Sequence, residues 1–123
     1  MTWLAVAAGG ALGSLARHVI NQFVQPPVLR FPIGIVLVNV AGCFIIGLLA
    51  GAMASTRLSL SQTGREFVFV GLLGGFTTFS AFGLDTFALA RTSPGLAITN
   101  VAAQVGGGLA AVWIGYLIGA KSS

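Results

Sequence analysis

Long stretches without a charged residue are the feature that most constrains the fold of this chain. They cover residues 2–16, 31–56, 67–84 and 92–120. A helix that crosses the hydrocarbon core of a bilayer needs roughly 20 mostly apolar residues. The sequence therefore predicts an all-α integral membrane protein, with one four-helix transmembrane domain over residues 1–123. We expect its spans at residues 2–24, 31–54, 65–91 and 94–119.

Composition supports a membrane protein and argues against several other classes. Charged residues make up 7% of the chain, against about 25% in a typical soluble domain. The six basic residues stand singly, which argues against a nucleic-acid-binding surface. A single cysteine, Cys43, leaves no disulfide framework and no Cys/His metal site. The first apolar segment has no basic leader and no obvious cleavage site, so we expect it to be retained as a helix.

The basic residues are almost evenly divided between the two sides of the membrane. With four spans, both termini and the central loop share one side. That side carries Arg57, Arg65 and Lys121, and the other carries Arg30 and Arg91, with Arg17 if it reaches outward. Membrane proteins are normally oriented by an excess of basic residues on the cytoplasmic side. Either the chain inserts in both orientations and pairs as an antiparallel dimer, or a small imbalance still fixes one orientation.

The segment from Gly74 to Phe82 departs from the apolar pattern of the third span. It reads Gly-Gly-Phe-Thr-Thr-Phe-Ser-Ala-Phe. Glycines and hydroxyl residues weaken a continuous helix, so we expect the third helix to be broken near its middle. At membrane depth such backbone must be buried in protein or line a cavity. Because broken helices form ion sites in transport proteins, this segment is the first candidate functional site.

The first span carries a polar face. Ser14, Arg17 and Asn21 recur at helical spacing with Gly10. An ionisable residue inside a membrane is a functional candidate by default, but Arg17 could also snorkel to the interface from near the helix end. His18 has no second ligand nearby in the sequence, so we expect it to be interfacial.

Amide side chains mark the second and fourth spans. Asn39 could donate an N–H to a passing anion or could simply join helices. Asn100, Gln104 and Gly108 recur every four residues and form a polar stripe in the fourth span. The stripe offers further N–H donors without a full charge.

Two kinds of ion chemistry are available around the expected break. A phenyl ring has a positive edge, so Phe79 and Phe82 could hold a small anion weakly enough to let it leave; they could equally be ordinary packing. Asp85 shares their helical face and could contact an ion or be solvated in a vestibule. Carbonyls freed near Gly74 and Thr77 would instead suit a monovalent cation.

The Gly74–Phe82 run resembles the signature of the CrcB/Fluc family of fluoride channels. The stretches Gly9–Arg17 and Asn39–Gly42 are also similar to that family, and the resemblance extends over the whole chain. It implies a fluoride-selective channel in the cell (inner) membrane that lets fluoride leave the cell and lowers its cytoplasmic toxicity. It also implies an antiparallel, dual-topology homodimer with a structural Na⁺ at its centre.

The resemblance also assigns roles to residues. It implies that Gly74 and Thr77 bind Na⁺ through their backbone carbonyls. The fluoride pore would be formed by Asn39, Thr78, Phe79, Ser80 and Phe82. Candidate pore or vestibule residues are Arg17, Asp85, Asn100 and Gln104. The chain departs from the family where Asp85 replaces Glu, where Asn100 and Gln104 replace Tyr and Ser, and where Cys43 and Ala81 replace hydroxyl residues.

Other classes explain the sequence less well. A small proton-coupled multidrug exporter would need a membrane-embedded carboxylate, but the first span has none and Asp85 lies late in the third span. A scaffold subunit would leave the Gly74–Thr78 segment unexplained. An enzyme is the least consistent, because no nucleophile–base pair or metal constellation stands out.

Overall fold

The computed structural model describes residues 2–121, and in that part of the chain all regular structure is helical. The elements are α1 (Thr2–Val24), α2 (Ile33–Ala54), α3 (Gln62–Arg65), η1 (Glu66–Leu73), α4 (Gly74–Phe76), α5 (Phe79–Thr92), α6 (Pro94–Val101), η2 (Ala102–Gly106) and α7 (Gly107–Ala120). Four stretches are long and apolar enough to cross a membrane, namely Thr2–Val24, Ile33–Ala54, Gln62–Thr92 and Pro94–Ala120. The prediction of a multi-pass, four-span protein is therefore confirmed.

The ends of the second and third spans differ slightly from the predicted bounds. The second begins at Ile33 because Pro32 precedes the helix as its N-cap instead of occupying its first turn. The third begins earlier than expected, at Gln62, because Ser61 caps it: its hydroxyl oxygen accepts a hydrogen bond from the Gly64 N–H at 3.0 Å.

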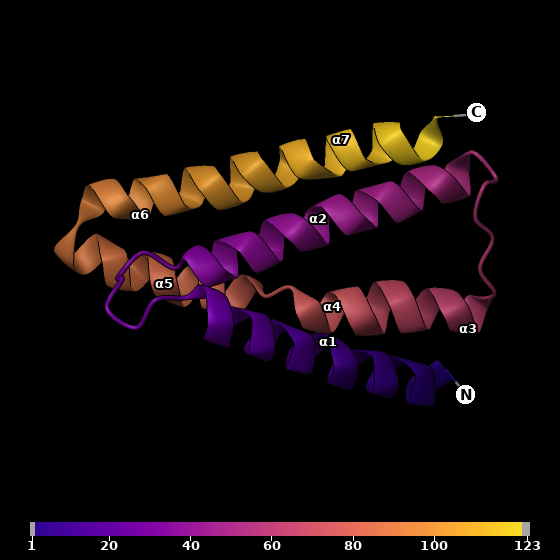
Figure 1. The fold of residues 1–123 in the computed structure, drawn as a ribbon, viewed down its shortest axis with the longest axis horizontal. Helices are drawn as coiled ribbons and strands as arrows, with labels where there is room; N and C mark the ends of the chain where they lie inside the picture. Colours follow the sequence, from indigo (N-terminus) through magenta and orange to yellow (C-terminus); the bar gives the residue numbers. More distant parts are fainter. Residues whose placement is uncertain (1, 122–123) are drawn as a thin grey trace.

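The four spans associate as two helix pairs. In Figure 1, α7 lies along α2, and α1 lies along α3, η1 and α4. Glycines bring α2 and α7 close together: a methyl group at Gly115 would overlap the Phe44 carbonyl and lie 2.9 Å from the Leu48 backbone nitrogen. Close backbone approach through small residues is a typical way for helices to associate in lipid, where apolar contact with a neighbour gives no advantage over lipid contact.

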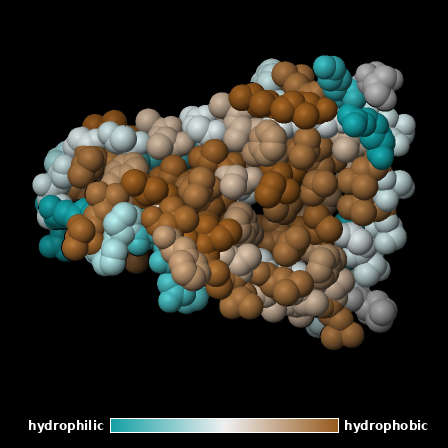
Figure 2. Space-filling view, in the orientation of Figure 1, coloured by the Kyte–Doolittle hydropathy of each residue, from teal (hydrophilic) through white to brown (hydrophobic). Residues whose placement is uncertain are grey.

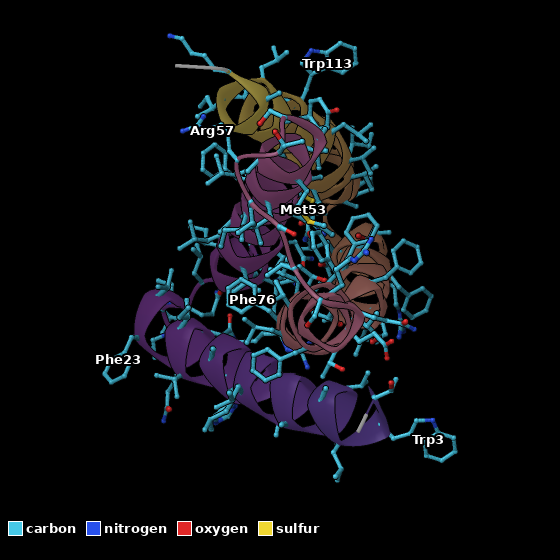
Figure 3. All side chains as sticks on the ribbon, turned by 90° about the vertical axis from the view of Figure 1, so that its right-hand side faces the viewer. Trp3, Phe23, Met53, Arg57, Phe76 and Trp113 are labelled. Atoms are coloured by element: carbon cyan, nitrogen blue, oxygen red, sulfur yellow. The ribbon has the colours of Figure 1, made fainter. Side chains whose placement is uncertain are left out.

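Glycines also bring α1 close to η1 and α4 in the second pair. A methyl group at Gly9 would overlap the Phe67 carbonyl of η1, and one at Gly13 would lie 2.8 Å from the backbone nitrogen of Phe76. Figure 3 shows the Phe76 ring between α1 and the helices that lie above it in that view. The ring reaches α2, because it lies 3.4 Å from where a methyl at Gly42 would be. Phe76 therefore connects the two pairs.

Most of the surface is apolar, and few large side chains are buried. Figure 2 shows apolar residues across the middle of one face and hydrophilic ones mainly toward the ends. The buried apolar side chains are Val38, Leu73, Leu89, Ala97 and Ala111. Trp3 and Trp113 point away from the helices (Figure 3). Such an exterior suits lipid, with aromatic side chains available for the interface.

Both chain ends and the α2–α3 connection lie at one end of the molecule (Figure 1). There Arg57 Nη1 donates to the backbone carbonyl of Lys121 at 2.6 Å and to that of Gly119 at 3.4 Å. These carbonyls belong to the C-terminal end of α7, where a cation is favoured by the helix dipole. Arg57 thus ties the central connection to the end of the fourth span.

Candidate functional site

Extended backbone interrupts the third span at Thr77 and Thr78. α4 ends at Phe76; the ψ of Thr77 is 160°, and Thr78 has φ −150° and ψ 119°. The Thr78 N–H donates to Asn39 Oδ1 at 2.9 Å, and Asn39 Nδ2 donates back to the Thr78 carbonyl at 3.1 Å. The Asn39 oxygen therefore replaces the helical acceptor that the Thr78 N–H gives up, and the Asn39 nitrogen adds a donor to the Thr78 carbonyl.

The helix resumes directly after the interruption. The Thr78 hydroxyl accepts the Ala81 N–H at 3.1 Å, so Thr78 is the N-cap of α5. Ser80, which is exposed, has its hydroxyl 3.2 Å from that of Thr78. Two of the predicted pore hydroxyls therefore lie together at the start of α5.

Helix α1 also contacts the interruption. Arg17 Nη1 donates to the Thr77 carbonyl at 3.0 Å, and the Ser14 hydroxyl lies 3.5 Å from the Gly75 carbonyl. Arg17 is half-buried. Its guanidinium therefore contacts the protein backbone at the break.

A cavity of about 350 Å³ lies beside the interruption. It is lined by Asn39, Gly42, Cys43, Ile46, Phe69, Leu73, Gly74, Thr77, Thr78, Phe79, Phe82, Gln104 and Val105. The rings of Phe79 and Phe82 have centroids 5.6 Å apart and are tilted by 51°. Phe79 is 81% exposed, so one of the two rings has very little packing within a single copy of the chain. The cavity combines polar groups at the break with an apolar wall.

A chain of hydrogen bonds leads from the cavity into the protein. Asn39 Nδ2 donates to Gln104 Oε1 at 2.6 Å, and Gln104 Nε2 donates to Asn100 Oδ1 at 3.1 Å. Asn100 Nδ2 donates to Thr86 Oγ1 at 2.9 Å, and Thr86 Oγ1 donates to the Phe82 carbonyl at 2.7 Å. The fourth-span stripe thus contacts both the second and third spans.

Some predicted residues lie outside this cavity, and one residue of the network was missed. Asn100 is fully buried, and neither it nor Asp85 belongs to the cavity lining. Thr86 was not predicted as part of the site, although it follows Phe82 by four residues and so shares its helical face. That spacing was the available signal, but a threonine in a span is too common to stand out.

Backbone oxygens are the groups here that could hold a cation. The Thr78 N–H would reach the Gly74 carbonyl in an uninterrupted helix, but it donates to Asn39 instead. Gly74 is exposed and lines the cavity. Between residues 2 and 121 there is no group of three or more His, Cys, Asp or Glu side chains suited to a metal. Neutral carbonyl oxygens of this kind fit a hard monovalent cation.

These features define a class: a multi-pass membrane protein whose interrupted third span borders a cavity with amide, hydroxyl and phenyl groups. The profile of the family described as CrcB-like protein, Camphor Resistance (CrcB), matches residues 4–116. The chain belongs to this family.

Curated relatives match nearly the whole chain. One from Solibacter usitatus is 43% identical over 120 residues, covering 96% of this chain and 98% of its own length. One from Methylobacillus flagellatus is 44% identical over 114 residues, covering 90% of this chain and 88% of its own. Both are named fluoride-specific ion channel FluC.

Proposed function

We propose that the chain is a fluoride-selective ion channel that lets fluoride leave the cell and so lowers cytoplasmic fluoride toxicity. The observation that carries the proposal is the 43% identity over 120 residues to a relative named as a fluoride-specific ion channel. The channel would act in the cell (inner) membrane of a bacterium. An ion channel agrees with the expectation that the chain is not an enzyme.

The cavity suggests how an anion could be stabilised without a buried counter-charge. A dehydrated fluoride ion needs hydrogen-bond donors or positive ring edges in place of water. Phe79 and Phe82 provide ring edges at the cavity, where the Thr78 hydroxyl and the Gln104 amide can donate. The Ser80 hydroxyl lies beside that of Thr78 but outside the cavity lining. Neutral groups hold the ion weakly enough for it to move on, as conduction requires.

The functional unit would be an antiparallel, dual-topology homodimer. Support comes from the exposure of Phe79 and Gly74 at the cavity and from the nearly even charge of the two ends. Arg17 is engaged with Thr77, so the count is three basic residues at one end and two, Arg30 and Arg91, at the other. A partner related by a two-fold axis could cover the open side of the cavity.

A structural Na⁺ would bind to the carbonyls of Gly74 and Thr77, with the equivalent pair from the partner. Gly74 has lost its usual helical donor, and the Thr77 carbonyl retains a second lone pair beside the one that Arg17 uses. The ion would supply fixed positive charge and join the two copies. Replacing Na⁺ with a bulky organic cation should lower both the dimer fraction in light scattering and the fluoride flux; unchanged values would contradict the site.

The channel proposal is tested with purified protein in liposomes. Fluoride efflux is followed with an ion-selective electrode in Na⁺ buffer, beside parallel chloride efflux and protein-free liposomes. We expect rapid fluoride loss and little chloride loss. Fluoride efflux equal to that of protein-free liposomes would overturn the assignment.

Phe82→Ile tests the ring edge at the cavity. Isoleucine is similar in bulk but has no positive edge, so we expect fluoride flux to fall by about tenfold or more, equivalent to about 1.4 kcal/mol. Phe23→Ile is the matched control, because Phe23 is 84% exposed and points away from the other helices (Figure 3). Equal flux in both variants would return Phe82 to a packing role.

A further inference from the structure

The hydrogen bonds among Asn39, Gln104, Asn100 and Thr86 all run in one direction. We call these four residues the amide relay. Each member donates to the next, and Thr86 donates to the Phe82 carbonyl. The relay therefore joins α2, η2, α6 and α5 in one polarised chain.

Backbone groups at both ends fix this direction. At one end the Thr78 N–H can only donate, so it requires the Asn39 oxygen. The Asn39 nitrogen then faces the Gln104 oxygen, and the Gln104 nitrogen faces Asn100. At the other end the Phe82 carbonyl can only accept, so Thr86 must give it its single hydrogen and accept from Asn100. If any one of these amides were reversed, two hydrogen-bond donors or two acceptors would face each other inside the protein.

The relay leaves one amide N–H donor at the cavity, on Gln104. A primary amide has two N–H groups, and Asn39 uses one on Gln104 and one on the Thr78 carbonyl. Gln104 also lines the cavity, is only 8% exposed, and gives its oxygen to Asn39 and one N–H to Asn100. Its second N–H is the polar group of this amide that is left for an ion.

We propose that Asn100 and Thr86 are positioning residues that hold the Gln104 amide so that it presents an N–H to an anion. This inference rests on the proposed channel function and adds the groups that set the polarity of one cavity wall. Asn100 acts through Gln104, because it is fully buried and lies outside the cavity lining. Thr86 acts one step further back, by accepting the Asn100 N–H.

Thr86→Val tests the proposal because valine keeps the shape of threonine and removes both hydrogen bonds of the hydroxyl. Without this acceptor, the Asn100 amide is held by Gln104 alone and can rotate, so Asn100 no longer fixes the Gln104 nitrogen and the N–H that it presents to the cavity. We expect the fluoride concentration for half-maximal flux to rise by about tenfold, the scale of one hydrogen bond. Thr86→Ser, which keeps the hydroxyl, should restore the wild-type value.

Thr99→Val is the matched control. Thr99 also donates its hydroxyl to a carbonyl four residues earlier, that of Gly95 at 2.9 Å, but it lies outside the relay. It should leave the half-saturating concentration unchanged. Equal values for Thr86→Val and wild type, or an equal shift in Thr99→Val, would overturn the positioning role.

Two further results distinguish a failure of this inference from a failure of the channel proposal or of protein folding. If wild-type protein passes no fluoride, the channel proposal fails and the relay is not the cause. If Thr86→Val does not fold, Thr86→Cys replaces it, since a thiol is a weaker donor and acceptor than a hydroxyl. We then expect a smaller rise in the half-saturating concentration, and no rise would overturn the inference.

Discussion

At the scale of single residues, two polar side chains from different spans fix the peptide groups of the break. Asn39 binds both the N–H and the carbonyl of Thr78, and Arg17 binds the carbonyl of Thr77. The sequence marks both as polar residues at membrane depth, which is rare enough to identify them. It does not identify their partners, because these lie 39 and 60 positions away along the chain.

Arg17→Met should destabilise the protein while retaining much of the bulk of the side chain. The Thr77 carbonyl would lose a hydrogen bond to a charged donor, typically about 1.5–3 kcal/mol. We expect a lower melting temperature in detergent, measured by thermal unfolding. Arg30→Met, which changes an exposed loop residue, is the control. Identical melting temperatures for both variants would show that the Arg17 contact does not support the fold.

At the scale of elements, the third span consists of two helical halves joined by extended residues. Gly, Thr and Ser in the Gly74–Phe82 segment predict a weak helix, and the extended residues lie within it. The sequence does not show that η1 and η2 are π-helical, because widened turns bury almost the same residue pattern as regular ones. Their positions depend on tertiary packing between spans.

Thr78→Ala tests the restart of the helix. Alanine removes the hydroxyl that accepts the Ala81 N–H, and loss of an N-cap typically costs about 0.5–2 kcal/mol. We expect faster hydrogen exchange at the first amides of α5 and a modest loss of thermal stability. Thr78→Ser keeps the cap and should exchange at the wild-type rate; equally fast exchange in both variants would count against the cap.

Gly115→Ala tests the contact between α2 and α7. The added methyl would overlap the Phe44 carbonyl, and the backbone of α2 cannot move away without a large energetic cost. We expect loss of a monodisperse peak in size-exclusion chromatography. Gly106→Ala lies in the same span and meets nothing within 4 Å, so it should fold normally. A monodisperse Gly115→Ala protein would show that α2 and α7 can move apart without loss of the fold.

At the scale of the whole molecule, four spans and an apolar exterior could be predicted from hydropathy alone. Their association as two pairs could not, because small residues occur in all four spans and do not specify their partners. The even charge balance is visible in the sequence, but its meaning depends on where each charge lies. Arg17 is engaged inside the protein, and Arg57 is bound to the end of α7.

Adding basic residues at one end should therefore control orientation. In Ser59→Lys combined with Gln62→Lys, two cations are added beside the central connection, so the positive-inside rule places that end in the cytoplasm. We expect a C-terminal tag to be accessible from both sides in wild type and from the cytoplasm alone in this variant. The matched control is Ser59→Gln with Gln62→Asn. Wild-type tags found on one side alone would exclude dual topology.

The π-helical segment η2 has a consequence for insertions and deletions. Asn100, Gln104 and Gly108 are buried at intervals of four residues, which is longer than the 3.6-residue turn of a regular helix. The wider turn of η2 takes up the difference, as though the span carried one extra amino acid. Removing Ala103 would therefore convert the wide turn into a regular one and leave the α7 glycines facing α2, whereas removing a residue from the regular turns of α7 would rotate everything after it by about 100°. In this span, η2 is therefore the place where the chain can lose one residue without changing which side chains face α2.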